Sequence, residues 1–232
     1  MSKSLMTTSS ITARCRSIVC RRRHRIQALH LQRILASARA IAAKNPAALR
    51  EYVALLGRPL QSRRMLRPVL PTDGIDAMDP QHLWFQESSW LQHESRSLRR
   101  VLRRVSTPVT MDLSRDLVLP WPWEVSRVQE CLATIGQDTR GGAWRQDSNH
   151  VVEVWLPFRI GWVHNGNHSI ATGILQGRGE FTTTEAFDAS GLLDLVRFDG
   201  SHFFQVSDGR ILSRPPDLAF AAIFEVGRLM RR

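Results

Sequence analysis

Short strand-like runs alternate with short helical stretches in the second half of the chain, and this alternation constrains the fold more than any other feature. Apolar and β-branched runs after Pro108 predict strands at 116–119, 151–156, 159–164, 180–186 and 203–206. Periodic apolar residues between and after them predict helices at 124–135, 169–175, 191–196 and 217–230. Strands interleaved with helices indicate an α/β or α+β domain, which we place at residues 106–232.

The first half of the chain is predicted to be helical, with a helical region at residues 21–105. An apolar stripe from Arg22 to about Lys44 predicts a first helix; its members are Ile26, Leu29, His30, Ile34, Ala38 and Ile41. Asn45-Pro46 predicts the start of a second helix that Gly57 ends, followed by a loop over 58–80 and a third helix over 80–105. The fold class is therefore α+β: a helical basic N-terminal region followed by a small mixed-sheet α/β domain.

The positive charge of the chain lies at its N-terminus. The formal net charge is +11, and residues 1–50 hold 11 basic residues and no acidic one, the first acid being Glu51. Residues 1–20 are expected to form a basic flexible tail, a composition also typical of an organellar transit peptide. Basic segments of this kind suit DNA as a partner. The arginines expected to contact DNA are Arg21, Arg22, Arg23, Arg25, Arg99, Arg100, Arg103 and Arg104.

The last four of these arginines crowd the end of the predicted third helix and have a second interpretation. Cations there also favour the helix dipole, so this end can be simply a solvated surface.

Composition excludes several classes of protein. An apolar share of 43% with seven Trp is too high for a disordered chain, and no apolar run is long enough to span a membrane. The three cysteines lack metal-ligand spacing and indicate a reducing, cytoplasmic compartment. The Trp-rich segments 84–90 and 121–123 are either core or a protein contact surface.

The segment Gly161–Gly179 carries the clearest chemical signal. An apolar strand ends at His164, the polar turn Asn165-Gly166 follows, and a helix begins at about Ser169. Asn and Gly both tolerate positive φ, and the unpaired N–H groups of the helix start face the turn. This arrangement predicts an anion site.

Two other interpretations of this segment stay open. Asn167 or Ser169 can simply cap the helix. His164 and His168 are four residues apart, a metal-pair spacing on a helix, but the turn between them breaks that geometry and no nearby acid completes a zinc set. His168 suits phosphate contact or proton transfer near neutral pH, whereas His150 and His202 are expected to be structural or surface residues.

A strand, then Asn-Gly-Asn-His, then a helix of small residues over Val163–Gly177 resembles the signature of the ParB/sulfiredoxin superfamily, especially its ParB-like nuclease branch. The resemblance covers this motif and, by element order, about residues 116–206. It departs from sulfiredoxin, whose motif carries a Cys where this chain has Asn167, and from the segregation proteins, which carry Gly-Glu-Arg-Arg. Ser169 stands where an Arg usually follows the His, and Arg178 or Arg159 is the candidate substitute.

The resemblance implies a phosphate site and, in some relatives, metal-dependent DNase and ATPase activity. The residues expected at the phosphate are His164, Asn165, Gly166, Asn167, His168, Ser169 and Arg178. The residues assigned to catalysis are His168, Asn167, Glu153 and Glu180, with the two carboxylates as ligands of Mg²⁺ and ATP or another nucleotide as the bound cofactor.

The predicted function is accordingly a bacterial, cytoplasmic phosphodiester hydrolase that acts on DNA, with nucleotide hydrolysis as a second activity. The resemblance extends to the Osa/FiwA-like plasmid fertility-inhibition proteins, which implies a plasmid-encoded inhibitor of conjugative transfer and a protein of the conjugation machinery as a partner. Two alternatives remain: a nucleotide- or DNA-binding adaptor without catalysis, and an inhibitor that acts through protein contact.

Overall fold

The computed structural model describes residues 8–70, 84 and 101–231. Its helices are α1 (Thr8–Lys44), α2 (Leu49–Leu66), α5 (Val125–Thr134), α6 (Asn167–Leu175), α7 (Ser190–Leu195) and α8 (Leu218–Met230), with a 3-10 turn η1 at Pro46–Ala48. Its strands are β1 (Arg103–Arg104), β2 (Val109–Asp112), β3 (Leu117–Leu119), β4 (Val151–Leu156), β5 (Ile160–Asn165), β6 (Glu180–Thr183), β7 (Ala186–Asp188), β8 (Val196–Phe198), β9 (Phe203–Gln205) and β10 (Ile211–Ser213).

A five-stranded mixed sheet lies at the centre, in the order β1-β7-β4-β5-β3. Strand β4 pairs antiparallel with β5 and parallel with β7, and β3 pairs parallel with β5. A three-stranded sheet (β10-β9-β8) and a two-stranded sheet (β2-β6) flank it. The α+β class, with a helical N-terminal region and a mixed sheet, is confirmed.

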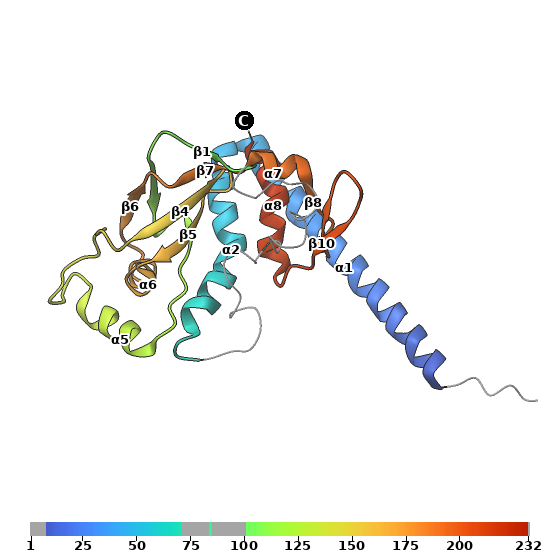
Figure 1. The fold of residues 1–232 in the computed structure, drawn as a ribbon, viewed down its shortest axis with the longest axis horizontal. Helices are drawn as coiled ribbons and strands as arrows, with labels where there is room; N and C mark the ends of the chain where they lie inside the picture. The colour runs from blue at the N-terminus through green and yellow to red at the C-terminus, as the bar shows by residue number, and fades with distance from the viewer. Residues whose placement is uncertain (1–7, 71–83, 85–100, 232) are drawn as a thin grey trace, which may run out of the picture.

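The two faces of the central sheet contribute side chains to two different hydrophobic cores. Successive side chains of a strand point to opposite faces, and in β3 the side chain of Val118 joins one core while Leu117 and Leu119 join the other. The larger core lies against α1, α2, α7 and α8, and the smaller core lies against α6. Figure 1 shows α2 and α8 on one side of the sheet and α6 on the other.

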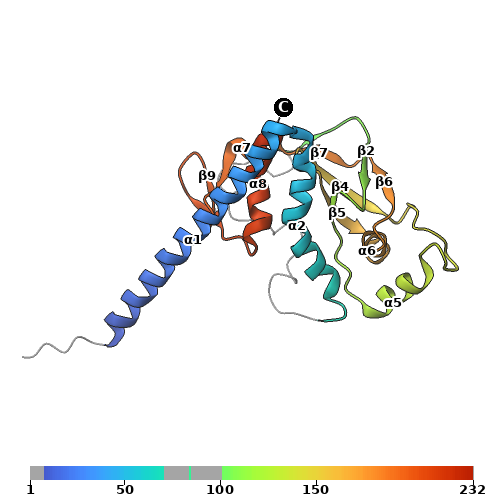
Figure 2. The same ribbon diagram turned by 180° about the vertical axis from the view of Figure 1, so that it is seen from behind.

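Helices α1 and α2 share the larger core with the sheet. Both helices pack on α8, and buried leucines of α2 contact the same cluster as Trp155 and Trp162. This core spans the predicted boundary near residue 105. Only the C-terminal part of α1 packs in this way, and its N-terminal part extends beyond the rest of the molecule (Figure 1, Figure 2).

Most of the predicted strands and helices are confirmed, several of them to within two residues. Strand β4 has the predicted bounds, and α5, α6, α7 and α8 match predicted helices. The predicted strand over 180–186 is divided into β6 and β7. Asn45 caps η1 by accepting a hydrogen bond from the N–H of Ala47, as the Asn45-Pro46 pattern predicts. The sequence patterns predict no strand at β2, β8 or β10.

Helix α2 does not end at Gly57 but continues to Leu66, so the prediction of a loop from residue 58 is wrong over that stretch. A Cβ at Gly57 would lie 2.2 Å from a methyl group of Leu117, so glycine allows the close approach of α2 to β3. Pro59 frees the carbonyl of Leu55, and the side chain of Leu55 is 65% exposed, on the solvent side of the helix. Tertiary packing therefore overrides two local helix breakers.

Three further predictions about the N-terminal half differ from the structure. Helix α1 begins at Thr8, where the sequence predicts a flexible tail to residue 20. Ile26, Leu29 and His30 are exposed, because the buried stripe of α1 begins only at Leu31. The predicted third helix lies largely outside the described residues, and its end is wrong, since Arg103–Arg104 form β1 and pair with β7.

No helix in the described part of the chain is long and apolar enough to cross a membrane.

Candidate functional site

The turn between β5 and α6 adopts the predicted left-handed conformation. Gly166 has φ 80° and ψ 19° and is the N-cap residue of α6. A Cβ at this position would lie 2.5 Å from Cδ2 of His150, so both the backbone angle and the space require glycine. The prediction of a strand, an Asn-Gly turn and a helix is confirmed.

The first turn of α6 has no side-chain cap. Gly166 supplies none, so the interpretation of Asn167 or Ser169 as the N-cap residue is wrong. The first helical hydrogen bond runs from the N–H of Ile170 to the carbonyl of Gly166. Within the described part of the chain, the backbone N–H groups of Asn167, His168 and Ser169 donate to no protein acceptor. These groups form the positive end of the helix dipole.

A cleft of about 420 Å³ opens at this helix start. Three segments supply its walls: the turn and first residues of α6, one side of α5, and the loop before β4. The lining residues are Trp123, Arg127, Glu130, Cys131, Asp147, Asn149, His150, Asn165, Gly166, Asn167, His168 and Ser169. The sequence prediction thus identified the floor of this cleft, and the structure adds its other two walls.

The side chains of Asn167 and His168 fix the segment Pro120–Glu124 above the helix start. Oδ1 of Asn167 accepts a hydrogen bond from the backbone N–H of Trp121 at 2.6 Å, and Nε2 of His168 accepts one from the N–H of Glu124 at 3.3 Å. The ring of Trp123 stands edge-on to the His168 ring, with centroids 4.7 Å apart. Asn167 and His168 are both buried, so their side chains serve first to position the segment Pro120–Glu124.

The protonation of His168 follows from these contacts. Burial and the neighbouring Arg127 lower the pKa of His168, while Glu124 opposes them. Since Nε2 accepts a hydrogen bond, the neutral ring carries its proton on Nδ1. The predicted role of His168 as a general acid near neutral pH does not fit a buried, neutral imidazole.

His150 and Ser169 form a second polar network in the cleft wall. Nδ1 of His150 accepts the N–H of Asp147 at 2.8 Å, which leaves the proton on Nε2, 3.0 Å from Oγ of Ser169. Nε1 of Trp144 donates to the same Oγ at 3.0 Å. Because Nε2 of His150 is a donor, His150 cannot accept the proton of Ser169, and the pair is a structural network, not a nucleophile with its base.

Four residues of the predicted site lie elsewhere. Val152, Val154 and Val163 face the core beneath α6, so the alternating residues Glu153 and His164 point to the other face of the sheet. There Nε1 of Trp155 donates to Glu153 at 2.5 Å, and His164 lies 3.8 Å from the same carboxylate. Arg178 and Glu180 are exposed beyond the far end of α6.

The structure does not bring to the α6 turn the two carboxylates that are predicted to bind Mg²⁺. Glu153 and Glu180 are the two carboxylates assigned to the metal, and neither lines the cleft. The residues present do not fit a metal held by this pair beside the α6 turn.

Of the arginines assigned to DNA, Arg22, Arg23 and Arg25 are exposed on α1, and Arg103 and Arg104 are exposed on β1. Arg104 forms an ion pair with Glu185 at 2.5 Å. The side chain of Arg21 and the whole of Arg99 and Arg100 lie outside the described residues.

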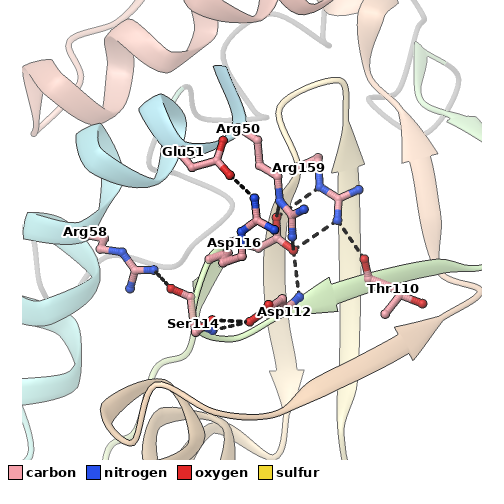
Figure 3. Close-up of polar contacts among 9 residues, drawn as sticks. Arg50, Glu51, Arg58, Thr110, Asp112, Ser114, Asp116 and Arg159 are labelled. Carbon is pink, nitrogen blue, oxygen red and sulfur yellow. Dashed lines mark hydrogen bonds and ion pairs between the residues drawn. The ribbon is translucent and has the colours of Figure 1, made fainter. Parts of the chain in front are cut away.

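A second polar cluster, which the sequence did not indicate, joins α2 to the sheet (Figure 3). At its centre is Asp116, whose side chain is fully buried and accepts hydrogen bonds from both Arg50 and Arg159. The backbone N–H of Asp112 donates to it at 2.8 Å, and Arg159 also donates to the carbonyl of Thr110. Two outer contacts, Arg58 to Ser114 and Arg115 to Glu51, enclose the cluster.

Sequence reasoning missed several residues of the α6 cleft because no local pattern marks them. His150 has the structural role that the sequence predicts, and together with Asp147 and Asn149 it also forms a wall of the cleft, which the sequence did not indicate. Trp144 anchors their loop by inserting into the core beneath α6. The only available signal was the cluster of polar residues between Arg145 and His150 just before a predicted strand.

Comparison with known proteins gives one match. No curated protein and no solved structure matches the chain. A family model described as a family of unknown function, DUF6710, matches residues 17–232, and the chain therefore belongs to that family.

Proposed function

We propose that this protein binds a phosphate group, carried by a nucleotide or by nucleic acid, in the cleft at the start of α6. The observation that carries the proposal is the row of backbone N–H groups at Asn167, His168 and Ser169, which have no acceptor among the described residues and follow a glycine in the left-handed conformation. Such a helix start favours anions through both its donors and its dipole.

Arg127 is the cation of the cleft and would form the other side of the phosphate contact. It lines the cleft and is 64% exposed, with only a 3.4 Å ion pair to Glu124 on its own helix. The cleft also holds Glu130 and Asp147, so the preference for an anion rests on directed donors and not on a general positive field.

The resemblance to the ParB/sulfiredoxin superfamily supports the same assignment, because it attributes phosphate binding to this turn. A ParB/sulfiredoxin-like fold for residues 106–232 is part of the proposal. So is the plasmid fertility-inhibition role, which rests on the resemblance alone.

The geometry favours the first alternative, a binding module without catalysis, over the predicted hydrolase. The metal carboxylates lie away from the cleft, His168 is a buried acceptor, and His150 holds its proton toward Ser169. None of these groups is arranged to activate a water molecule.

The experiment compares ATP binding by two matched variants. Arg127→Ala should weaken ATP binding about fivefold, the effect of losing one exposed charge contact of about 1 kcal/mol. Arg178→Ala removes another exposed arginine, beyond the other end of α6, and should leave the affinity unchanged. Titration calorimetry measures both.

Equal affinity of wild type and Arg127→Ala, or a loss confined to Arg178→Ala, would contradict the proposed site. If the purified protein hydrolysed ATP or plasmid DNA in the presence of Mg²⁺, the hydrolase interpretation would be favoured over the binding module.

A further inference from the structure

The exposed part of α1 combines arginines with uncovered apolar side chains. Ile26 is 43% exposed and Leu29 is 48% exposed, although Leu31 in the next turn is 6% exposed. Arg22, Arg23 and Arg25 are exposed in the same turns of the helix. This stretch lies where α1 leaves the body of the molecule (Figure 1, Figure 2).

Three of these residues, Arg22, Arg23 and Ile26, border a groove of about 520 Å³ between α1 and the start of α8. Its lining residues are Arg22, Arg23, Ile26, Gln27, His30 and Leu218. We refer to this surface as the α1 groove. Its floor is apolar and its rim is cationic.

The α1 groove rests on a fixed part of the helix. Gly200 packs so closely on α1 that a Cβ there would lie 2.9 Å from the Cα of Ala28. Oγ of Ser201 bonds the side chain of Gln27 at 2.9 Å, and the rings of His24 and His202 are 5.1 Å apart. The turn between β8 and β9 thus holds α1 in place beneath the groove.

No carboxylate among the described residues neutralises the rim. Arg22, Arg23 and Arg25 form no ion pair there, and no acidic residue precedes Glu51 in the chain. Two carboxylates beside groove-forming residues in the sequence already have partners: Asp217 pairs with Arg63 and caps α8, and Asp199 accepts the N–H groups of Ser201 and His202. The described part of the chain therefore offers this rim no free carboxylate, and an acidic partner would complement its charge.

We propose that the α1 groove binds an acidic, amphipathic helical segment of a partner protein. Apolar side chains of the segment would cover Ile26 and Leu218, and its carboxylates would pair with Arg22 and Arg23 of the rim. Nucleic acid fits less well, because a phosphate backbone would satisfy the arginines and leave the apolar floor in water. A second copy of α1 fits least, since it brings the same positive charge.

The test uses the full chain and a fluorescent helical peptide with Leu on one face and Glu on the other. Ile26→Ser should weaken peptide binding about tenfold, the effect of losing an apolar anchor at an interface. Leu55→Ser is the matched control, because Leu55 is also exposed but lies on α2. Arg23→Glu should abolish binding, whereas Arg140→Glu on a distant exposed loop should not.

Two comparisons decide the class of partner. A peptide with Ser in place of every Leu keeps the charge and should bind at least tenfold more weakly, because it cannot cover the floor. The proposal would be overturned if both peptides bound equally or if the Leu peptide did not bind. It would also be overturned if a DNA duplex bound more tightly than the Leu peptide and Ile26→Ser left that DNA binding unchanged. Circular dichroism confirms that each variant is folded.

Discussion

The Asp116 cluster and the α6 cleft are both rich in polar groups, and they differ in whether those groups are satisfied. In the Asp116 cluster the central carboxylate accepts hydrogen bonds from two guanidinium groups and a backbone N–H. In the α6 cleft three consecutive backbone donors have no acceptor among the described residues. Polarity alone therefore does not distinguish the two regions, and our proposal of a binding site rests on the unused donors beside an open space.

The difference follows from what each region does in the fold. Asp116 ties α2 to the β2–β3 turn and to Arg159 at the start of β5, so its hydrogen bonds close the structure (Figure 3). Burial opposes ionisation of Asp116, but hydrogen bonds from Arg159 and Arg50 outweigh burial and lower its pKa. The donors of α6 hold no part of the protein together and remain available to a ligand.

The largest expected effect comes from breaking the satisfied cluster. Asp116→Asn should lower the free energy of unfolding by about 3 kcal/mol, because it leaves two guanidinium groups without their buried counter-charge. Urea denaturation measures the loss. ATP affinity of the folded fraction should not change, and a stability equal to that of wild type would mean that the cluster contributes little to holding α2 on the sheet.

A smaller effect is expected at the turn of the cleft. Gly166→Ala should cost about 2 kcal/mol, because φ is 80° and the new Cβ would press on His150, and it should also abolish ATP binding. Gly209→Ala is the control, because φ is 71° and no atom lies within 4 Å of the added Cβ. This variant should lose only about 1 kcal/mol, which is what the left-handed backbone conformation costs a residue with a Cβ. Equal losses in the two variants would contradict the close packing of Gly166 against His150.

The smallest effect is on the pH dependence of stability. Burial lowers the pKa of His150 and of His168 below the ordinary value of 6.5. As the pH falls, the histidines of the unfolded chain are therefore protonated before those of the folded protein. The stability that the two neutral, buried histidines contribute is complete above pH 6.5 and is lost as the pH falls below it. The melting temperature should decline as the pH falls below 6.5, and this decline should be shallower in His150→Gln. An identical decline in that variant would mean that His150 is not buried in the neutral form.

The same contrast explains how much the sequence could predict. The β5 strand, the Asn165-Gly166 turn and α6 are local, because alternation and turn chemistry act between neighbouring residues. Strand β4 was predicted with its observed bounds for the same reason. The unused donors of the cleft follow from that local geometry, so the sequence could indicate the site's floor.

Contacts between distant segments left no such pattern. Asp116 bonds Arg50 and Arg159 across 66 and 43 positions of the chain, and neither arginine differs locally from the many others. Glu153 and His164 were assigned to the site because they are close to it in sequence, yet the alternation of β4 and β5 turns them to the other face of the sheet. The sequence therefore predicted the turn and the first residues of α6 at the cleft, whereas the structure places Glu153 and His164 away from it.

The most direct test of the central claim follows the backbone amides of isotope-labelled protein by NMR as inorganic phosphate and then ATP are added. Binding at the α6 cleft predicts that the N–H signals of Asn167, His168 and Ser169 shift together and saturate, with smaller changes at Arg127. Shifts confined to α1, or none at these three amides under saturating ATP, would contradict phosphate binding in the cleft.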